Sequence, residues 1–353
     1  MKIGIFDPYL DDNGGGERYM VTVATCLSKN HSVDIFWDEE DDLYAIGKRF
    51  GLDVSRLNLV ENIFSANYPK LDKYKKTKKY DAIIVLSDGS IPLLFSKKTY
   101  LHMQQPIEHS LNVREKLKLK KVNKLIVNSK FTKNFIESKY NQKCELLYPP
   151  VSLIKSEIKE NTILHVGRFR VMNVKTEDYK KQQFMIDTFK EMVDDGLSGW
   201  RFLLAVSLND EKDARFLKMK ESAKNYPIDF LINSEKDDLW RKAGRAKIYW
   251  HATGFGEDLV KYPHLAEHFG ISTAEAMGAG IVPVVISAGG QKEIVEEGVS
   301  GLLWETKDEF KKKTLRLISD KKELDRLSKK AVLKAVEYSD ESFCKNVNRI
   351  INV

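Results

Sequence analysis

The chain has 353 residues, of which 42% are hydrophobic and 31% are charged, and its formal net charge is +7. This is an ordinary globular composition, and it excludes a chain that is disordered, collagen-like or coiled-coil throughout. The length by itself predicts two domains.

Short apolar runs in the first part of the chain alternate with amphipathic stretches. Six of these runs predict buried strands: Lys2–Phe6, Val33–Trp37, Ala82–Leu86, Thr99–His102, Leu125–Val127 and Glu145–Leu147. Arg18–Ser28 and Thr132–Lys139 have the spacing of helices, and the acidic run Asp38–Asp42 is expected to be a solvated loop. Alternation of strands and helices predicts a parallel sheet in an α/β domain.

A second series of the same kind occupies the rest of the chain. Its predicted strands are Thr162–Val166, Phe202–Val206, Phe230–Ile232, Ile248–Trp250 and Val282–Ile286. Its predicted helices are Phe184–Met192, Ala214–Ala223 and Thr273–Met277. Two series of this length predict two Rossmann-like, doubly wound domains.

The domain boundary is predicted at Tyr148–Val151. Its two consecutive prolines neither continue a helix nor supply hydrogen-bond donors to a sheet. The chain ends with two helical patterns, Lys321–Glu337 and Ser342–Asn352. We therefore expect domains at 1–150 and 151–337, followed by a terminal helix at 338–353.

The stretch Asn67–Cys144, called the basic face below, carries 18 Lys or Arg residues against 6 Asp or Glu residues. One interpretation is a solubilising surface. The other is a patch that docks on anionic lipid or on a phosphate-bearing acceptor. Nucleic acid is not an expected partner, because no recognisable nucleic-acid module accompanies the charge.

The termini and cysteines indicate the compartment. The opening MKIGIFDPYL is too short for a signal-peptide core, and no run approaches the ~20 apolar residues of a membrane span. Cys26, Cys144 and Cys344 are odd in number and far apart, and they form no Cys-x-x-Cys pair. This pattern argues against a disulfide framework or a zinc site, so we expect a soluble cytoplasmic protein.

A glycine-rich stretch, Asn13–Arg18, joins the first predicted strand to the first helix. Glycines there let the backbone approach a ligand, and the helix start offers N–H groups to a phosphate or an acceptor hydroxyl. A dinucleotide fingerprint would need a third glycine where Tyr19 stands. The missing glycine argues against the hypothesis that the protein is an NAD dehydrogenase. A simple tight turn is the alternative.

Basic residues follow the first strand of the second series. Arg168 ends the segment VGRF, and Lys180 and Lys181 open the next predicted helix. Strand ends in such sheets face the binding crevice, where these cations would neutralise a diphosphate and stabilise a leaving group. Isolated Arg and Lys side chains are more often simply solvated on the surface. A functional role for Arg168 and Lys180 therefore needs the support of a further motif.

That motif is EHFGISTAEAMGAG, which contains Glu267 and, eight positions later, Glu275. The small residues around Glu275 let its helix lie close to the sheet. Near a helix start Glu275 would be favoured by the dipole and would accept hydrogen bonds from vicinal hydroxyls. The string resembles the E-x7-E signature of the retaining glycosyltransferases of family 4, and Gly289-Gly290-x-x-Glu293, NSKFT, YPPV, VGRF and GGGER match further landmarks in order.

The resemblance covers nearly the full chain and implies the GT-B fold. Two Rossmann-like domains would face a cleft, with an acceptor-binding amino-terminal domain, a nucleotide-sugar-binding carboxy-terminal domain and a final helix crossing back to the first. The donor nucleotide sugar would be held by Glu275, Gly14, Gly15, Gly16, Phe269, Gly270, Ile271, Lys181 and His251. The catalytic residues would be Glu267, Arg168, Lys180 and His102.

Three of these assignments keep alternatives. The family usually places its lysine five or six residues after the arginine, whereas Arg168 and Lys180 are twelve apart, so Lys175 and Lys181 also remain candidates for the diphosphate contact. His102 matches a position near the reacting centre in many members, or is a satisfied loop histidine. His251 lines the cleft or is a core histidine.

The implied reaction moves a sugar from a UDP- or GDP-sugar to an acceptor hydroxyl with retention, in glycan or glycoconjugate synthesis. Fixed cations and helix N–H groups would stabilise the departing diphosphate. No Asp-x-Asp triplet occurs, so we expect no metal and no cofactor beyond the donor substrate. Expected partners are the nucleotide sugar, a carbohydrate or lipid-linked acceptor and, through the basic face, the inner membrane surface.

Two rival functions share parts of this site. A nucleotide-sugar epimerase or hydrolase of the same fold would share much of the donor site. A non-catalytic sugar-nucleotide-binding or scaffold protein would bind nucleotide without turnover. The base, the sugar, the acceptor and the oligomeric state are not predicted by the sequence.

Overall fold

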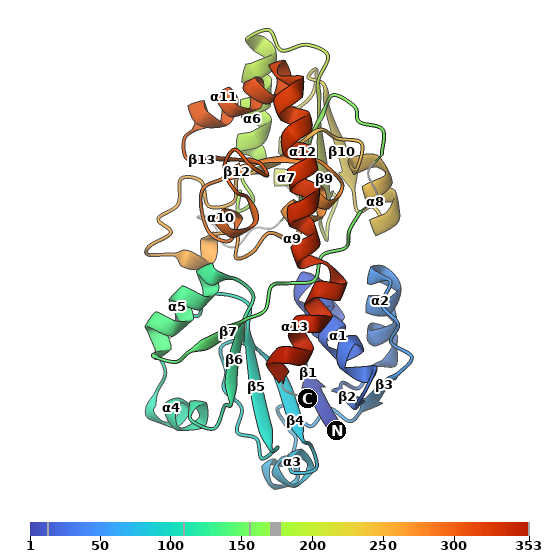
Figure 1. Cartoon of the computed structure of the whole chain (residues 1–353), viewed down its shortest axis with the longest axis vertical. Helices are drawn as coiled ribbons and strands as arrows, with labels where there is room; N and C mark the ends of the chain where they lie inside the picture. The colour runs from blue at the N-terminus through green and yellow to red at the C-terminus, as the bar shows by residue number, and fades with distance from the viewer. Residues whose placement is uncertain (13, 109, 155–156, 170–177, 352–353) are drawn as a thin grey trace. The chain divides into compact units, whose positions relative to one another are not determined.

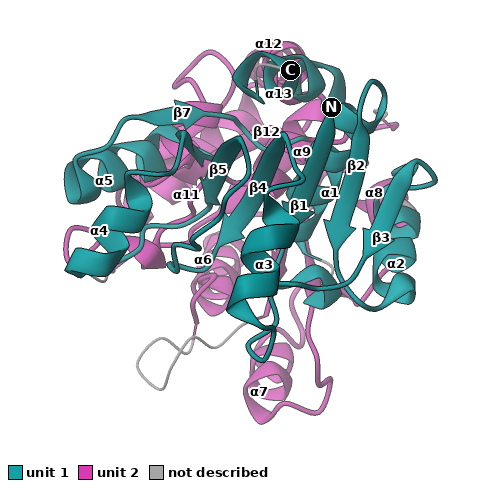
Figure 2. Ribbon diagram, turned by 90° about the horizontal axis from the view of Figure 1, so that it is seen from below, with its two compact units in different colours: residues 1–150, 340–353 teal, residues 151–339 magenta. Residues whose placement is uncertain are grey.

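The computed structural model of the chain divides into two compact units (Figure 2). Unit 1 comprises Met1–Pro150 and Asp340–Val353, and unit 2 comprises Val151–Ser339. The structure describes residues 1–12, 14–108, 110–154, 157–169 and 178–351. Asn13 and Lys175, both considered above, lie outside the described residues.

Unit 1 is built around a seven-stranded parallel sheet in the order β3-β2-β1-β4-β5-β6-β7, most of which Figure 2 shows side by side. The strands are β1 Lys2–Phe6, β2 Ser32–Phe36, β3 Leu57–Val60, β4 Ala82–Ser87, β5 Lys98–Met103, β6 Lys124–Val127 and β7 Cys144–Leu146. The helices are the 3-10 turn η1 Leu10–Asp12, α1 Gly15–Ser28, α2 Glu40–Phe50, α3 Lys70–Thr77, α4 Val113–Leu119, α5 Lys130–Tyr140 and α13 Asp340–Ile351.

Strand β4 shows why these runs become buried parallel strands. All six of its residues are buried. Ala82, Ile84 and Leu86 belong to the core on one face of the sheet, and Ile83 and Val85 belong to the core on the other face. Successive side chains of a strand point to opposite faces, so a strand covered on both faces is apolar at every position.

The terminal helix α13 packs beside α1 within unit 1 (Figure 1). Phe343 is in edge contact with Tyr19, and Arg18 lies 3.6 Å from Asp340. Cys26 on α1 and Cys344 on α13 form a disulfide across a sequence separation of 318 residues. The expectation of no disulfide was wrong, because the chain's return to unit 1 brings two distant cysteines together.

Unit 2 holds a six-stranded parallel sheet in the order β10-β9-β8-β11-β12-β13. The strands are β8 Thr162–Arg168, β9 Arg201–Ser207, β10 Ile228–Ile232, β11 Ile248–His251, β12 Val282–Ile286 and β13 Leu302–Trp304. The helices are α6 Gln182–Asp194, α7 Ala214–Ser222, α8 Lys236–Ala243, η2 Pro263–Leu265, α9 Ile271–Gly278, α10 Gln291–Ile294, α11 Lys307–Ser319, α12 Lys321–Ala335 and η3 Val336–Tyr338.

Aromatic side chains fill the core of unit 2. Trp250 of β11 packs on Phe202 of β9 and Phe310 of α11, and Trp304 of β13 stacks on Phe310. Trp250 also donates its indole N–H to the Thr314 hydroxyl. Large rings of this kind bury much apolar area and hold the strand ends, and therefore the residues after them, in place.

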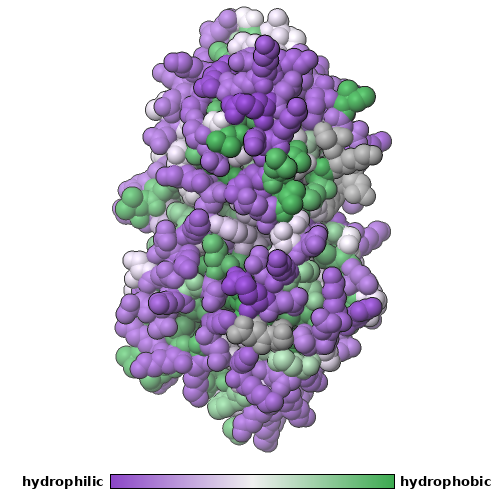
Figure 3. Space-filling view, in the orientation of Figure 1, coloured by the Kyte–Doolittle hydropathy of each residue, from purple (hydrophilic) through white to green (hydrophobic). Residues whose placement is uncertain are grey.

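The acidic run after β2 differs from its prediction. Glu40, Asp41 and Asp42 form the first turn of α2 rather than a solvated loop. Negative side chains at a helix start interact favourably with the helix dipole, which explains why this polar run begins a helix. The short strands β3 and β13 were not predicted either. On the face shown in Figure 3, apolar residues form separate patches on a mostly hydrophilic surface.

Candidate active site

Two strands of unit 2 end in residues that were predicted to act on the donor. Arg168 is the last residue of β8, and His251 is the last residue of β11. The two strands are direct neighbours in the sheet, and both run parallel. Carboxyl ends of neighbouring parallel strands share one edge of the sheet, the edge at which such folds bind ligands.

Glu267 lies at the centre of a polar cluster in unit 2. Its Oε2 accepts a hydrogen bond from Lys180 Nζ at 2.8 Å and lies 3.1 Å from His251 Nε2. The Glu267 and Lys180 side chains are 21% and 18% exposed, and that of His251 is 2% exposed. Three residues predicted for the site are thus in direct contact, although they come from separate parts of the sequence.

The electrostatics of this cluster favour a charged carboxylate. Burial acts to raise the pKa of Glu267, but Lys180 and His251 outweigh it and hold that pKa well below its usual value. Burial also lowers the pKa of His251, and this effect outweighs the contact with Glu267, which acts to raise it. A neutral His251 donates its Nε2–H to the carboxylate, leaving a pair of opposite charges between Lys180 and Glu267.

The two adjacent lysines have different partners. Lys180 binds Glu267, whereas Lys181 Nζ lies 2.6 Å from Glu257 Oε1. Lys181 has a left-handed backbone with φ of 56°, an uncommon conformation for a residue with a side chain. The structure therefore brings Lys180, and not Lys181, into the Glu267 cluster.

Two helix starts in this region differ in how their N–H groups are used. The Asp178 carboxylate accepts hydrogen bonds from the backbone N–H groups of Gln182, Gln183 and Phe184, so it caps α6. Helix α9 follows Gly270 and, among the described residues, has no side-chain cap. An uncapped helix start is suited to an anion, which favours the turn before α9 over α6.

The turn Glu267–Ile271 is held by the glycine pair of the sequence motif. A Cβ atom on Gly289 would lie 2.2 Å from the Glu267 carbonyl oxygen, and one on Gly290 would lie 2.4 Å from that of His268. The Gly290 N–H donates to the Glu267 carbonyl at 2.8 Å. Only glycine permits this approach, so the pair positions Glu267 and the turn that contains Phe269 and Gly270.

Glu275 lies in the middle of α9 and is 9% exposed. Tyr249 of β11 hydrogen-bonds to the hydroxyl of Ser272, one turn before Glu275, at 2.8 Å. Burial, with a smaller contribution from the charges of Glu267 and Glu275, raises the pKa of Tyr249. The buried carboxylate therefore belongs to the same polar region as Glu267.

His165 is a site-supporting residue that the sequence analysis missed. It is fully buried on β8, with Nδ1 3.0 Å from the Trp250 carbonyl oxygen and Nε2 3.4 Å from Gln182 Nε2. Burial lowers its pKa to about 3, so the ring is neutral at pH 7. A Cβ on Gly167 would lie 2.8 Å from His165 Nε2, which explains the glycine of VGRF.

The glycine stretch in unit 1 starts α1. The Gly14 N–H donates to Glu17 Oε2 at 2.6 Å, which caps the helix from within. A Cβ on Gly16 would lie 2.6 Å from Gln104 Oε1, so this glycine permits contact with the residue after β5. Because Glu17 already uses the Gly14 N–H, contact of Gly14–Gly16 with a donor phosphate stays a prediction.

His102 of β5 is buried in unit 1, with 1% of its surface exposed. Its ring stacks on Tyr19 at a centroid distance of 4.0 Å, and its Nδ1 lies 3.2 Å from the Ile126 carbonyl oxygen. Burial lowers its pKa to about 3. A neutral, stacked ring is what a structural histidine requires, and the catalytic role of His102 stays a prediction.

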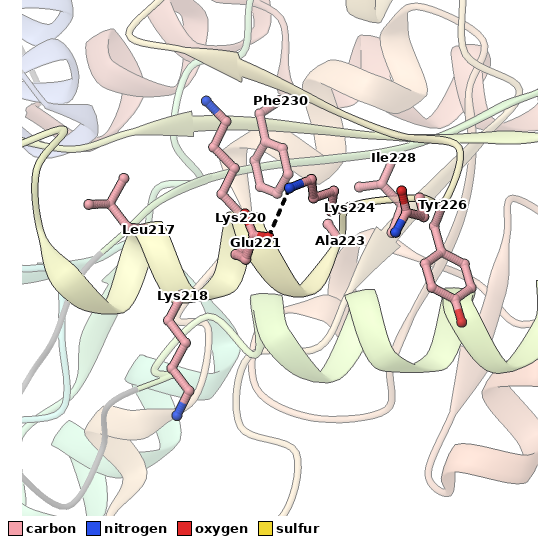
Figure 4. A pocket seen from close by; sticks show the side chains of 10 residues that line it. Leu217, Lys218, Lys220, Glu221, Ala223, Lys224, Tyr226, Ile228 and Phe230 are labelled. Atoms are coloured by element: carbon pink, nitrogen blue, oxygen red, sulfur yellow. Dashed lines mark hydrogen bonds and ion pairs between the residues drawn. The ribbon is translucent and has the colours of Figure 1, made fainter.

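A pocket elsewhere in unit 2 contains none of the predicted site residues. It lies between α7 and β10 and is lined by Lys218, Lys220, Lys224, Tyr226 and Phe230 among others (Figure 4). Lys224 pairs with Glu221, and Lys218 and Lys220 point in opposite directions. Since its lysines do not converge, we place the functional site at Glu267 instead.

Comparison with known proteins decides the family. The family model for glycosyl transferases group 1 matches residues 154–333, which is just over half of the chain. The chain belongs to the glycosyl transferases group 1. The match contains Glu267, Glu275, Arg168 and Lys180, and it identifies this group 1 chain as a glycosyltransferase.

Solved structures show that the group 1 chain has the GT-B fold. HepE from Anabaena, in complex with UDP, is 16% identical with a TM-score of 0.73, and the match covers 100% of each chain. Sucrose-phosphate synthase from Thermosynechococcus elongatus is 13% identical with a TM-score of 0.72, covering 100% of this chain and 98% of the other. The α/β class predicted from the sequence is therefore confirmed.

A curated relative is more similar in sequence. The GDP-Man:Man(3)GlcNAc(2)-PP-Dol alpha-1,2-mannosyltransferase of Xenopus laevis is 26% identical over 246 residues, which is 63% of this chain and 47% of that protein. The matched segment thus spans about half of the relative's length. None of the described helices of the group 1 chain is long and apolar enough to cross a membrane.

Proposed function

We propose that this glycosyltransferase moves a sugar from a nucleotide diphosphate sugar to an acceptor hydroxyl with retention of the anomeric configuration. The observation that carries the proposal is the contact of Glu267 with Lys180 and His251, beside the uncapped start of α9. A carboxylate there accepts hydrogen bonds from sugar hydroxyls, while cations and N–H groups stabilise a diphosphate.

Each candidate site residue of unit 2 named here has a proposed role. Glu267 binds donor-sugar hydroxyls next to the backbone N–H groups of Phe269, Gly270 and Ile271. Glu275 binds the ribose hydroxyls. Arg168 and Lys180 hold the diphosphate, and His251 keeps the Glu267 carboxylate in place through the 3.1 Å contact.

In the proposed step the bond between the anomeric carbon and the diphosphate oxygen breaks. The acceptor oxygen forms its new bond on the same face of the sugar, and its proton passes to the diphosphate oxygen that departs. Lys180 and Arg168 stabilise the negative charge that develops on the leaving group, and this electrostatic stabilisation lowers the barrier to transfer. We propose that these cations act without a metal ion.

The donor base is proposed from two directions. The mannosyltransferase relative is named for GDP-Man, and HepE forms a complex with UDP, so the proposed donor is a GDP- or UDP-sugar. The acceptor is a carbohydrate or a lipid-linked carbohydrate, in glycan or glycoconjugate synthesis. An epimerase or hydrolase would share the donor site, but it would release product without an acceptor being consumed.

The basic face is proposed to contact anionic membrane. Lys73 of α3 and Lys118 of α4 are close enough that burial and the charge of Lys118 lower the pKa of Lys73. Leu71 and Leu117, on the same two helices, are 73% and 59% exposed. Cations beside exposed aliphatic side chains suit the surface of an anionic bilayer.

A thermal-shift panel tests the donor assignment. The pure chain is heated with UDP, GDP, ADP and the matching sugar nucleotides, with a chelator present. We expect one nucleotide to raise the melting temperature by mass action, and Glu275→Gln to abolish that shift. Glu305→Gln, at an exposed glutamate of unit 2 outside these motifs, serves as the control. An unchanged shift in Glu275→Gln refutes the ribose assignment.

A further inference from the structure

His165 of β8 links two parts of unit 2 that are distant in the sequence. Its ring is fully buried, and its Nδ1 lies 3.0 Å from the carbonyl oxygen of Trp250 on the neighbouring strand β11. Its Nε2 lies 3.4 Å from the side-chain nitrogen of Gln182, the first residue of α6. One side chain therefore contacts both the sheet and the start of the helix that directly follows Lys180 and Lys181.

The two ring nitrogens of His165 have opposite roles. Burial lowers the pKa of the imidazole to about 3, so at pH 7 the ring is neutral and carries a single N–H group. A carbonyl oxygen only accepts hydrogen bonds, so the hydrogen is on Nδ1, which donates to Trp250. Nε2 is then an acceptor, and the Gln182 amide donates to it. The tautomer of His165 thus fixes the direction in which the Gln182 amide points.

A glycine leaves room for this contact. A Cβ atom on Gly167 would lie 2.8 Å from His165 Nε2 and 3.6 Å from Gln182 Nε2, so a side chain at this position would displace the histidine ring. Gln182 is itself only 1% exposed. A buried polar group that loses its partner costs free energy, so each of the two side chains depends on the other.

Gln182 also closes the turn from which Lys180 projects. Its backbone N–H donates to Asp178 Oδ1 at 2.6 Å, and the Lys181 N–H donates to the Asp178 carbonyl oxygen at 3.0 Å. From this turn the Lys180 side chain reaches Glu267 Oε2 at 2.8 Å. The buried side chain of Gln182 therefore ties the end of the turn to the sheet beneath it.

We propose that His165 is a positioning residue that sets where the Lys180 ammonium meets the donor diphosphate. This inference rests on the proposed function and deepens it, because it assigns the placement of the leaving-group cation to a buried histidine. A lysine side chain is flexible, so its ammonium is placed accurately only where the backbone that carries it is held. His165 holds that backbone through Gln182 and is itself anchored on the Trp250 carbonyl.

The test compares the affinity for nucleoside diphosphates with the affinity for nucleosides. The full chain and its variants are titrated with UDP, GDP, uridine and guanosine, and binding is measured by calorimetry or, for weak ligands, by saturation-transfer NMR. In the proposed site only the diphosphates contact Lys180. A displaced Lys180 therefore weakens diphosphate binding and leaves nucleoside binding unchanged, whereas general damage to unit 2 weakens both.

Three single variants assign the effect to residues. Lys180→Met should weaken binding of the preferred diphosphate about tenfold, as the loss of a hydrogen bond to a charged group does. His165→Leu and Gln182→Met should each weaken it about fivefold, because they loosen the lysine without removing it. In the Lys180→Met background the same two changes should weaken diphosphate binding no further, since the group through which they act is gone.

Gln183→Met is the matched control. Gln183 is the next residue of α6, but its amide donates to Asp187 and Ser222 instead of His165. Its loss should leave the ratio of diphosphate to nucleoside affinity at the wild-type value. Circular dichroism verifies that each variant folds. If His165→Leu does not fold, it is replaced by His165→Asn, which retains a donor for the Trp250 carbonyl and lacks the acceptor for Gln182.

The outcomes separate this inference from the proposed function. Failure of the wild-type chain to bind any nucleoside diphosphate overturns the proposed function and, with it, the role of His165. If a diphosphate binds but His165→Leu and Gln182→Met keep the wild-type affinity ratio, only the positioning role is overturned. The same conclusion follows if these variants weaken nucleoside binding equally, or if they still weaken diphosphate binding in the Lys180→Met background.

Discussion

Lys180 donates a hydrogen bond to the carboxylate of Glu267 across 2.8 Å, although 87 residues separate them in the sequence. Both side chains are about four-fifths buried, and His251 contacts the same oxygen. A buried ion pair of this kind is sensitive to the loss of either partner, because the remaining charge is left in a poorly solvated place. Substitution of either residue is therefore a sensitive test of the proposed chemistry.

Loss of the Glu267 charge should slow sugar transfer. We expect Glu267→Gln to lower kcat by about a hundredfold or more, as loss of a preorganised electrostatic contact does. Lys180→Met should have a similar effect. The double variant should cost less than the two single changes together, by about 1–2 kcal/mol, as in other contacting pairs. Strict additivity would contradict a functional contact between the two residues.

The control for this cycle is Lys181→Met, which removes the neighbouring cation and its contact with Glu257. Because Lys181 does not reach Glu267, its loss should show no coupling to Glu267→Gln. Nucleotide release is followed with and without acceptor, which separates transfer from hydrolysis.

The buried carboxyl of Asp7 should make stability depend on pH. Its pKa is raised from 3.8 to about 7 in the folded chain, so the folded state binds the proton more tightly than the unfolded state. The stabilisation is complete below about pH 4 and is lost as the pH rises to about 7, up to about 4 kcal/mol in total. We expect Asp7→Asn to melt at a higher temperature than the wild type at pH 8.

At pH 5 that advantage should shrink, because the wild-type carboxyl is then protonated and resembles the amide. Asp53→Asn, at an exposed aspartate, should show no such trend. Equal melting temperatures of wild type and Asp7→Asn at both pH values would contradict a raised pKa.

Reduction of the Cys26–Cys344 disulfide should destabilise unit 1. The bond closes a loop across 318 residues, and native disulfides typically contribute about 2–4 kcal/mol. We expect a reducing agent to lower the melting temperature of the wild type. Cys344→Ala should have the lower melting temperature from the start, and the reducing agent should not change it. Cys144→Ala should still melt at a lower temperature when the reducing agent is added.

Intact-mass measurement with and without a thiol-alkylating reagent verifies the bond in the oxidised sample. A chain whose three cysteines all react without reduction would contradict the disulfide.

The basic face should bind anionic vesicles at low salt. Each lysine near such a surface contributes about 1 kcal/mol, so Lys73→Glu and Lys118→Glu should each weaken binding by fivefold or more. Flotation with vesicles that contain phosphatidylserine measures the bound fraction. Lys242→Glu, an exposed lysine of unit 2, is the control. No flotation at low salt leaves the basic face as a solubilising surface.

Much of the fold could be predicted because it is encoded locally. The run Ala82–Leu86 is apolar at every position and becomes the fully buried β4. Asp38–Asp42 was misjudged because its charge suggested a loop, whereas its last three residues start α2. The three-residue strand β13 is too short to show a period.

The site could be predicted only in part. Glu267 and Glu275 were found because their spacing lies within one continuous string. The sequence could not decide which of the three lysines contacts the diphosphate. That depends on the left-handed backbone of Lys181 and on the direction of the Lys180 side chain. His165 gave no signal, since a histidine inside an apolar strand has the same pattern whether or not it supports a site.

The sequence by itself determined the α/β class, the two series of strands and the glutamate motif, because these depend on neighbours along the chain. Only the tertiary structure decided that Cys26 meets Cys344, that Lys180 and His251 both contact Glu267, and that the carboxyl group of Asp7 is buried directly after β1. Contacts between distant residues follow from strand order and burial, which local periodicity does not contain.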